Sequence, residues 1–422
     1  MRNVISAVCI SCGAEHEADD AAYTCKKCGG ILEVEYDYGY IKSRLTREVL
    51  AGRQDFSMWR YRELLPIEED SRLSPLRVGW SPLYRAKKLG ERLGLQNLYI
   101  KDDGLNPTAS LKDRASAIAV VRAAHAGKHT VACSSTGNAA SSLAGNAAAM
   151  GLESFIFVPE RAPKGKLIQL LVFGAHVISV KGNYEDTFRL SAEAIEKYGW
   201  YNRNAAINPY LSEGKKTVSL EIAEQLGFKA PDYVAVSVGD GCTIAGVWKG
   251  FKDLYAVGLI DKLPRLISVQ ASLCCPVNRA IETKGPLEPM EENTLADSIA
   301  VGVPRNGEKA LRAIRESGGL TVNVSDEEIL AAMGLLGVTT GVFGEPAGVT
   351  GTAGIKKAAE QGALPPGAVI VSLVTGNGLK DTVSAQKAAQ EPSFPGAGMI
   401  QIPPDLDVLI KEMESGFGNK FS

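Results

Sequence analysis

The stretch that decides the fold joins a strand to a helix and reads Asp103-Gly104-Leu105-Asn106-Pro107-Thr108-Ala109-Ser110-Leu111-Lys112-Asp113-Arg114. A β-rich run over residues 98–100 precedes it, and a helical pattern from Lys112 to Ala126 follows it. We expect Ser110 to cap this helix, with Asp113 completing a pair of the capping-box kind. Lys112 then lies in the first helical turn, where the positive end of the helix dipole disfavours a cation.

A lysine at that position suggests a role other than surface charge. An amine whose pKa is lowered can form a Schiff base with a carbonyl compound. The motif alone leaves a second interpretation open, in which Lys112 is an ordinary solvated residue of the first turn.

Two more loops run from a strand into a helix. The first, Ser134-Ser135-Thr136-Gly137-Asn138-Ala139-Ala140-Ser141, suits an anion such as a carboxylate or phosphate, although ordinary helix caps have the same composition. The second, Val238-Gly239-Asp240-Gly241-Cys242-Thr243-Ile244-Ala245-Gly246, allows a phosphate to approach its backbone closely. It matches neither a Walker loop nor G-x-G-x-x-G, which makes nicotinamide chemistry a weak alternative.

Outward from these loops, strand and helix patterns alternate along most of the chain. This alternation predicts an α/β fold of two domains, each with a parallel sheet covered by helices on both faces. Ligands bind such sheets at the carboxyl ends of the strands. We assign a large domain to residues 41–112 and 216–422, a small domain to 113–215, and a separate module to 1–40.

The N-terminal module contains two C-x-x-C pairs, each followed by glycine. Four thiolates with this spacing favour a tetrahedral structural zinc site formed by Cys9, Cys12, Cys25 and Cys28. The alternative is four thiols without a metal. The other cysteines, Cys133, Cys242, Cys274 and Cys275, are expected to be buried thiols.

Composition excludes several classes of protein. Lysine and arginine total 46 against 48 aspartates and glutamates, so no basic excess indicates nucleic-acid binding. The four histidines have no metalloprotease spacing. No apolar run is long enough to span a membrane, and the first residues do not resemble a secretion signal. We therefore expect a cytoplasmic protein with no nucleic-acid or membrane partner.

One lysine and two anion-binding loops together suit a phosphorylated aldehyde cofactor, pyridoxal phosphate. Over nearly its whole length the chain resembles the threonine synthases, which are fold type II pyridoxal-phosphate enzymes, some with a zinc-ribbon-like N-terminus. The resemblance rests on Trp59-Arg60-Tyr61, Ser81-Pro82-Leu83, the Asn106–Arg114 stretch and Thr375-Gly376-Asn377-Gly378-Leu379-Lys380-Asp381.

The resemblance implies a role for each loop. Lys112 resembles the Schiff-base lysine, Asn138 would hydrogen-bond the 3′-oxygen of the cofactor, and Thr375 would face its pyridine nitrogen. The cofactor phosphate would bind to Gly239, Asp240, Gly241, Cys242 and Thr243. The substrate carboxylate would bind to Ser135, Thr136, Gly137 and Ala139. Glu345-Pro346 resembles a segment that lines the cofactor pocket.

The chain departs from the family pattern at three places. Ala109-Ser110-Leu111-Lys112 stands where Gly-Ser-Phe-Lys is usual. Asp240 is unusual beside a phosphate, and we expect its carboxylate to point away from that group. Leu211 and Lys215 replace the usual arginine and glutamine, so Lys215 is our candidate for binding the substrate phosphate.

The family implies conversion of O-phospho-L-homoserine and water to L-threonine and phosphate, by γ-elimination and β-addition in a homodimer. A related fold type II lyase, such as a threonine dehydratase or a cysteate-forming enzyme, is the nearest alternative. A zinc-ribbon binding protein whose α/β body has lost catalysis is the alternative from another class.

Overall fold

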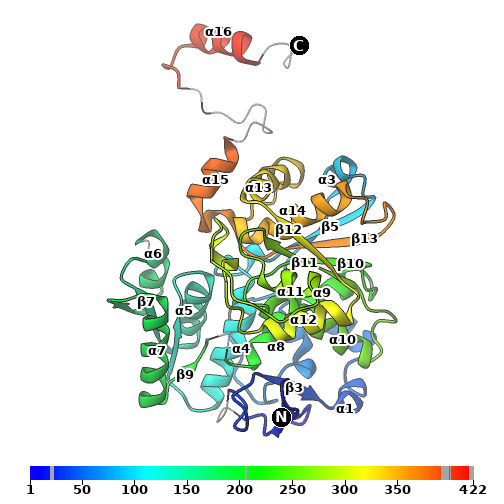
Figure 1. The fold of residues 1–422 in the computed structure, drawn as a ribbon, viewed down its shortest axis with the longest axis vertical. Helices are drawn as coiled ribbons and strands as arrows, with labels where there is room; N and C mark the ends of the chain where they lie inside the picture. The colour runs from blue at the N-terminus through cyan, green and yellow to red at the C-terminus, as the bar shows by residue number, and fades with distance from the viewer. Residues whose placement is uncertain (20–22, 163, 205–206, 391–398, 400, 418–422) are drawn as a thin grey trace.

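The computed structural model describes residues 1–19, 23–162, 164–204, 207–390, 399 and 401–417. It contains three sheets, which take their strands from separate parts of the chain. Figure 1 shows the smaller parallel sheet with helices α5, α6 and α7 on the left, and the larger sheet with its helices on the right.

The N-terminal sheet is antiparallel, with the order β2-β1-β3. Its strands are β1 (Val4–Cys9), β2 (Glu15–His16) and β3 (Leu32–Tyr36). Three short helices follow it, namely α1 (Tyr38–Lys42), α2 (Arg47–Gly52) and the 3-10 helix η1 (Met58–Leu64). This module is the part of the chain that holds both C-x-x-C pairs.

The larger sheet has six strands in the order β12-β11-β10-β13-β5-β4. Only the edge strand β4 pairs antiparallel; the other neighbours are parallel. The strands are β4 (Leu83–Arg85), β5 (Asn97–Asp102), β10 (Tyr233–Ser237), β11 (Arg265–Ala271), β12 (Leu320–Val324) and β13 (Val369–Val374).

The smaller sheet has four parallel strands in the order β8-β7-β6-β9. The strands are β6 (Thr130–Ser134), β7 (Glu153–Pro159), β8 (His176–Val180) and β9 (Tyr201–Asn202). The six-stranded and the four-stranded sheet therefore confirm the expected parallel α/β architecture. The domain boundaries stay a prediction.

Helices surround both parallel sheets. Those near the smaller sheet are α4 (Lys112–His125), α5 (Asn138–Met150), α6 (Lys164–Val172), α7 (Tyr184–Tyr198) and α8 (Tyr210–Lys215). Those of the larger part are α3 (Lys87–Leu93), α9 (Thr217–Gln225), α10 (Cys242–Ala256), α11 (Pro276–Glu282), α12 (Gly307–Glu316), α13 (Asp326–Thr340), α14 (Pro346–Glu360) and α15 (Thr382–Ala389). The last helix, α16 (Leu406–Phe417), lies apart from both sheets in Figure 1.

Strand β10 shows how the larger sheet is buried on both faces. Val234 and Val236 belong to one hydrophobic cluster, which also includes residues of α10. Ala235, between them, belongs to a second cluster, which includes residues of α14. Successive strand residues point to opposite faces, so helices cover both faces, as the continuous apolar strand pattern predicts.

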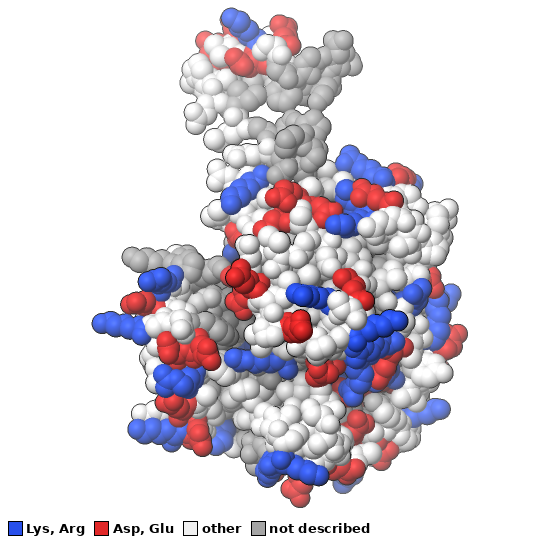
Figure 2. Space-filling model, viewed as in Figure 1, with Lys and Arg blue, Asp and Glu red and all other residues white. Residues whose placement is uncertain are grey.

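Surface charges are mixed. Acidic and basic side chains alternate over the face shown in Figure 2, in keeping with a net charge of −2. Among the described residues, no helix is long and apolar enough to cross a membrane.

The close packing of helix α8 against helix α4 can be tested at Gly214. A Cβ atom added at Gly214 would lie 2.1 Å from the Arg114 carbonyl oxygen, which is backbone and cannot move alone. We expect Gly214→Ala to force α8 away from α4 and to lower the free energy of unfolding by about 1–3 kcal/mol. Urea denaturation measures this, with Gly52→Ala as control because a Cβ there meets nothing within 4 Å. Equal stability of the two variants would contradict the close packing.

Candidate active site

The loop before Lys112 is fixed by the loop that follows β13. Leu111 N donates to Thr375 O at 2.8 Å, and Asn377 N donates to Ala109 O at 3.1 Å. Ala109 adopts a φ of +67°, a region that costs an L-residue energy and favours glycine. The family's usual glycine at this position has a physical reason, and the chain bears the strain because both sides of Ala109 are tied down.

The expected capping of α4 by Ser110 is wrong. The helix begins after Leu111, which makes no side-chain cap bond, and the buried Ser110 Oγ has no hydrogen-bond partner among the described residues. Asp113 instead accepts hydrogen bonds from Thr108 N and Thr108 Oγ1, both at 2.7 Å. The carboxylate therefore folds back on the preceding loop, because Ser110 is held in a bridge with Gly376.

Lys112 lines a small inner cavity together with every residue that the sequence assigned to the cofactor. The other members of that set are Asn138, Gly239, Asp240, Gly241, Cys242, Thr243 and Thr375, and Lys215 also lines the inner cavity. The loops that carry them follow the carboxyl ends of β5, β6, β10 and β13. This is the edge at which parallel sheets bind ligands.

Lys112 is in an environment that disfavours its charge. Burial and the Lys215 ammonium lower the pKa of Lys112 from 10.5 to about 8. Arg203 lowers it further, against the opposing influence of Cys242 and Glu345. A substantial fraction of the amine is therefore neutral near pH 8, as a nucleophile or base requires.

The loop after β10 needs its glycines. A Cβ at Gly239 would lie 2.7 Å from Ile299 Cα, and one at Gly241 would lie 2.6 Å from Asn306 O. Gly241 also has a φ of +90° and is the N-cap of α10. The free N–H groups at the start of this long helix suit a phosphate.

Asp240 is tied to the neighbouring loop. Its Oδ1 accepts from Arg305 N at 2.8 Å, and its Oδ2 accepts from Asn306 Nδ2 at 3.0 Å. The Asp240 carbonyl also accepts from Asn306 N at 3.0 Å. These bonds offset the negative charge, although the orientation of the carboxylate relative to a phosphate stays a prediction.

Cationic side chains gather behind this loop. The Cys242 thiol lies 3.3 Å from Ser212 Oγ; burial raises its pKa, but the charge of Lys215 and hydrogen bonds with Lys215 and Ser212 together lower it. Arg203 is buried and donates from Nε to Ser116 Oγ at 3.0 Å, and its Nη2 has no hydrogen-bond partner among the described residues. A cluster of positive charge suited to a polyanion is thus formed by Lys112, Lys215 and Arg203.

The loop after β6 opens on a second, outer cavity of about 600 Å³. Thr136, Gly137 and Asn138 line it, whereas Ser135 and Ala139 line neither cavity. Ser135 Oγ instead accepts from Gly137 N at 3.2 Å, which shapes the turn. Asn138 thus faces both cavities.

Four residues that line the inner cavity lie outside every motif of the sequence analysis. Ser237, Ser298, Ile299 and Ala347 are small or apolar residues without a local motif. Only Ser237 carried a signal, because it ends a buried strand just before the glycine loop. Glu345 also lines both cavities, in agreement with the resemblance of Glu345-Pro346 to a pocket segment.

The four N-terminal cysteines form one cluster. Their sulfur atoms lie within 4.8 Å of one another, and Cys9 Sγ is 3.5 Å from Cys28 Sγ. Gly13 and Gly29 have φ values of +70° and +73°, which lets each knuckle turn back on its own cysteine pair. The predicted burial of Cys133, Cys242, Cys274 and Cys275 is confirmed.

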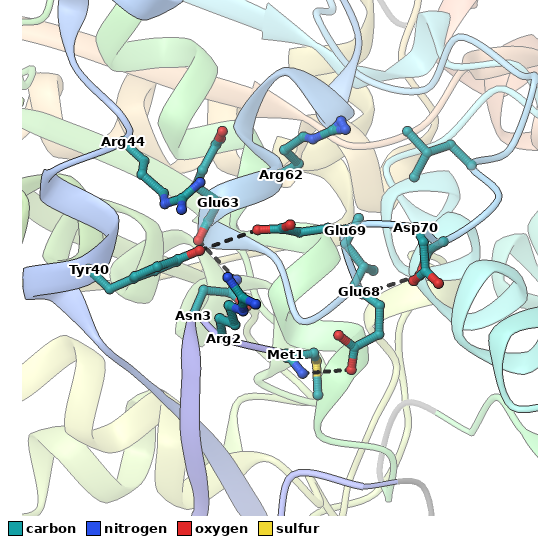
Figure 3. Close-up of a pocket in the computed structure, with 13 residues that line it drawn as sticks. Met1, Arg2, Asn3, Tyr40, Arg44, Arg62, Glu63, Glu68, Glu69 and Asp70 are labelled. Carbon is teal, nitrogen blue, oxygen red and sulfur yellow. Dashed lines mark hydrogen bonds and ion pairs between the residues drawn. The ribbon is translucent and has the colours of Figure 1, made fainter.

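A further cavity near the N-terminus lies away from these groups. This cavity of about 610 Å³ is lined by residues 1–3, Tyr40, Arg44 and residues of the segment 62–73, and Figure 3 shows acidic and basic side chains on its walls. Tyr40 Oη donates to Glu69 Oε1 there at 3.2 Å. None of the loops that follow the parallel strands contributes to it.

Comparison with known proteins agrees with the geometry. Residues 75–376 match the family model described as "Pyridoxal-phosphate dependent enzyme". The chain belongs to this family. Threonine synthase of Methanocaldococcus jannaschii is 40% identical over 95% of this chain and 97% of its own. Threonine synthase of Methanosarcina acetivorans is 39% identical over 93% of this chain and 96% of its own.

Solved structures share the pyridoxal-phosphate enzyme fold at lower identity. Threonine deaminase isoform 2 of Solanum lycopersicum has a TM-score of 0.62 at 22% identity, covering 74% of this chain and 87% of its own. Diaminopropionate ammonia lyase of Escherichia coli has a TM-score of 0.63 at 19% identity, covering 73% of this chain and 87% of its own. At this identity the likeness shows the fold alone.

The lowered pKa of Lys112 predicts how this pyridoxal-phosphate enzyme takes up its cofactor. We expect apoprotein and pyridoxal phosphate to form a yellow chromophore at a rate that rises with pH and is half-maximal near pH 8, because only the neutral amine attacks the aldehyde. Lys215→Met should move the midpoint to higher pH by removing a neighbouring cation. Stopped-flow absorbance measures the rate. Lys252→Met serves as control, because this partly exposed lysine pairs with Glu316 and lines neither cavity. A midpoint unmoved by Lys215→Met would refute this interaction.

Proposed function

We propose that the protein converts O-phospho-L-homoserine and water to L-threonine and phosphate. The observation that carries the proposal is the inner cavity, where Lys112 lies with the glycine loop 239–243 and Thr375. Identity of 40% to a threonine synthase over 95% of the chain supports the same reaction.

The residues of the inner cavity fit pyridoxal phosphate. The glycine cradle at the start of α10 offers backbone N–H groups to its phosphate, and the buried Arg203 and Lys215 leave positive charge nearby. Lys112, Asn138 and Thr375 would hold the aldehyde, the 3′-oxygen and the pyridine nitrogen. When bound, the cofactor supplies the carbonyl for the lysine and an electron sink.

Lys112 has two tasks in this proposal. The Lys112 Nζ would remove the α-proton and then a β-proton of the substrate, which requires a neutral amine. The phosphate would leave from the γ-carbon, and the two protons taken by Nζ would return to the γ-carbon and the α-carbon. The hydroxyl of a water molecule would add at the β-carbon, and the remaining proton of that water would go to the released phosphate. The neutral hydroxyl of Thr375 would not hold the pyridine nitrogen protonated, as an aspartate would.

The substrate would be bound at both ends. The N–H groups at the start of α5, with Ser135, Thr136, Gly137 and Ala139, would hold its carboxylate. Lys215 would supply positive charge to its phosphate, supported by the position of Lys215 in the inner cavity. The family also implies a homodimer and a cytoplasmic location.

We further propose a structural zinc ion at the cysteine cluster. Four sulfur atoms within 4.8 Å fit tetrahedral thiolate coordination. Lys27 N approaches Cys25 Sγ at 3.4 Å, a backbone hydrogen bond of the kind that stabilises a metal-bound thiolate. His16 Nε2 also lies 3.2 Å from Cys25 Sγ. Such a site would hold the small module together, since its hydrophobic cluster consists of only a few residues.

The reaction is tested by incubating the purified holoenzyme with O-phospho-L-homoserine and measuring phosphate and amino acids. We expect equal amounts of phosphate and threonine. Lys112→Ala should lose turnover by a factor of at least about 10³, since it removes both nucleophile and base. Release of 2-oxobutyrate in place of threonine would indicate a dehydratase, and threonine formation by Lys112→Ala would refute the role of the lysine.

The metal site is tested by elemental analysis of the purified protein. We expect one zinc per chain, and loss of most of it in Cys12→Ser because three thiolates bind the ion more weakly. The thermal midpoint should fall with the metal content. Cys275→Ser is the matched control, since this buried thiol lies outside the cluster. A metal-free wild-type protein with unchanged stability would contradict the proposal.

A further inference from the structure

Glu345 is a buried carboxyl group between the inner and outer cavities. It is 6% exposed and lines both cavities. It is also the N-cap residue of α14, and its N–H donates to Gly376 O at 2.9 Å. Its backbone is therefore anchored to the loop that also holds Ala109 and Leu111.

The Glu345 side chain contacts the residue expected at the cofactor's 3′-oxygen. Asn138 Nδ2 donates to Glu345 Oε1 at 2.6 Å, and both groups are buried. Asn138 is the first residue of α5, which packs on the smaller sheet, whereas α14 packs on the larger one. The hydrogen bond thus connects the two parallel-sheet units at the wall shared by the cavities.

Lys380 makes another contact between the same parts of the chain. Its Nζ donates to Ser141 Oγ at 3.1 Å and to Gln169 Oε1 at 2.7 Å. This ammonium lies on the outer cavity. The Asn138–Glu345 bond is the one of the two that reaches the inner cavity, so it is the one that can act on the cofactor.

The charged groups around Glu345 come from three elements besides its own. Burial raises the pKa of Glu345 to about 7, against the hydrogen bond from Asn138 and the positive charges of Lys112 on α4 and Lys380. Asp297, in the 3-10 helix η3 (Asp297–Ile299), raises it further. Burying a carboxyl group is costly unless it has partners, and the hydrogen bond from Asn138 gives this one a specific use.

We propose that Glu345 is a positioning residue that fixes the Asn138 amide for cofactor binding. An amide nitrogen has two N–H groups; Glu345 accepts from one and leaves the other for the 3′-oxygen of the cofactor. The same bond holds the start of α5, and with it the carboxylate loop, against the inner cavity. This inference rests on the proposed pyridoxal-phosphate site and assigns a function that acts through Asn138.

The test measures cofactor binding without substrate. Apoprotein is titrated with pyridoxal phosphate, and the dissociation constant and absorption maximum are recorded for wild type, Glu345→Ala, Asn138→Ala and the double variant. We expect each single variant to raise the dissociation constant roughly tenfold, which is the effect of losing one well-placed hydrogen bond. The two single variants should shift the absorption maximum in the same way. The double variant should bind no worse than Asn138→Ala, because both changes remove the same interaction.

Two further variants separate positioning from general stability. Glu345→Gln keeps an acceptor oxygen and should bind within about threefold of wild type, since the lost interaction is small. Glu345→Asp keeps the carboxylate but places it one methylene farther from Asn138, so it should weaken cofactor binding. Combined with Asn138→Ala, it should weaken binding no further than Asn138→Ala alone, which keeps the test available even if Glu345→Ala does not fold. Glu360→Ala, in an exposed ion pair with Lys356 at the other end of α14, is the control.

Additive losses in the double variant, or wild-type affinity in Glu345→Ala and Glu345→Asp, would overturn the inference while leaving the cofactor site intact. Failure of the wild-type protein to bind pyridoxal phosphate would overturn the proposed function as well. The two failures are therefore distinguishable.

Discussion

The active site depends on a buried ionic network around Arg114, two residues after Lys112. Arg114 Nε lies 2.7 Å from Asp103 Oδ2, and Nη2 lies 2.8 Å from Glu221 Oε2. Lys101 Nζ lies 2.7 Å from the same Glu221 oxygen. Two cations and two carboxylates balance one another, and Arg114 and Lys101 hold the pKa of Glu221 at about 2 despite its burial. Removing one partner from such a network typically costs about 3–5 kcal/mol, because the others are left as buried unpaired charges. The network ties the end of β5, the start of α4 and helix α9 together, and so it sets the position from which Lys112 enters the cavity.

The N-terminal module supports the opposite side of the same cavity. Lys309 Nζ on α12 donates to Leu32 O at 2.5 Å, and Tyr36 Oη donates to Glu213 Oε2 on α8 at 2.8 Å. Helix α12 begins just after Asn306, which binds Asp240 in the glycine loop 239–243, and α8 carries Lys215. The two ends of strand β3 thus contact α12 and α8, one on each side of the glycine loop. A module far from the chemistry in sequence has a direct structural connection to it.

Local sequence rules could predict the elements better than the side-chain contacts. The strand–helix alternation predicted parallel sheets, and Lys112 does begin its helix, because hydrophobic pattern and loop composition act over short distances. The Ser110 cap was predicted from spacing alone and is wrong, since pairing with Gly376 takes Ser110 out of the capping position. Neither the Arg114 network nor the Asn138–Glu345 bond has a local signal, because their partners lie 107 and 207 residues apart in the chain. Ser298 and Ile299 reach the cavity for the same reason, from a segment that carries no motif.

The arrangement also explains why each loop alone was a weak indicator of a cofactor site, whereas the loops taken together indicated one. Each loop alone fits a common helix cap or turn, and only the topology brings four of them to one cavity. Strands β13 and β5 are neighbours in the larger sheet although they are far apart in the chain, which brings Thr375 beside the backbone of Leu111. Strand β6 belongs to the other sheet, and its loop reaches the same cavity through Asn138 and its bond to Glu345. A lysine in a dipole-opposed position is then stabilised as a neutral amine by burial and neighbouring cations. Three features of the sequence are unfavourable, namely an alanine at positive φ, a first-turn lysine and an acid in a glycine-rich loop at a helix start. They are concentrated where tertiary contacts offset them and where a reaction can use them.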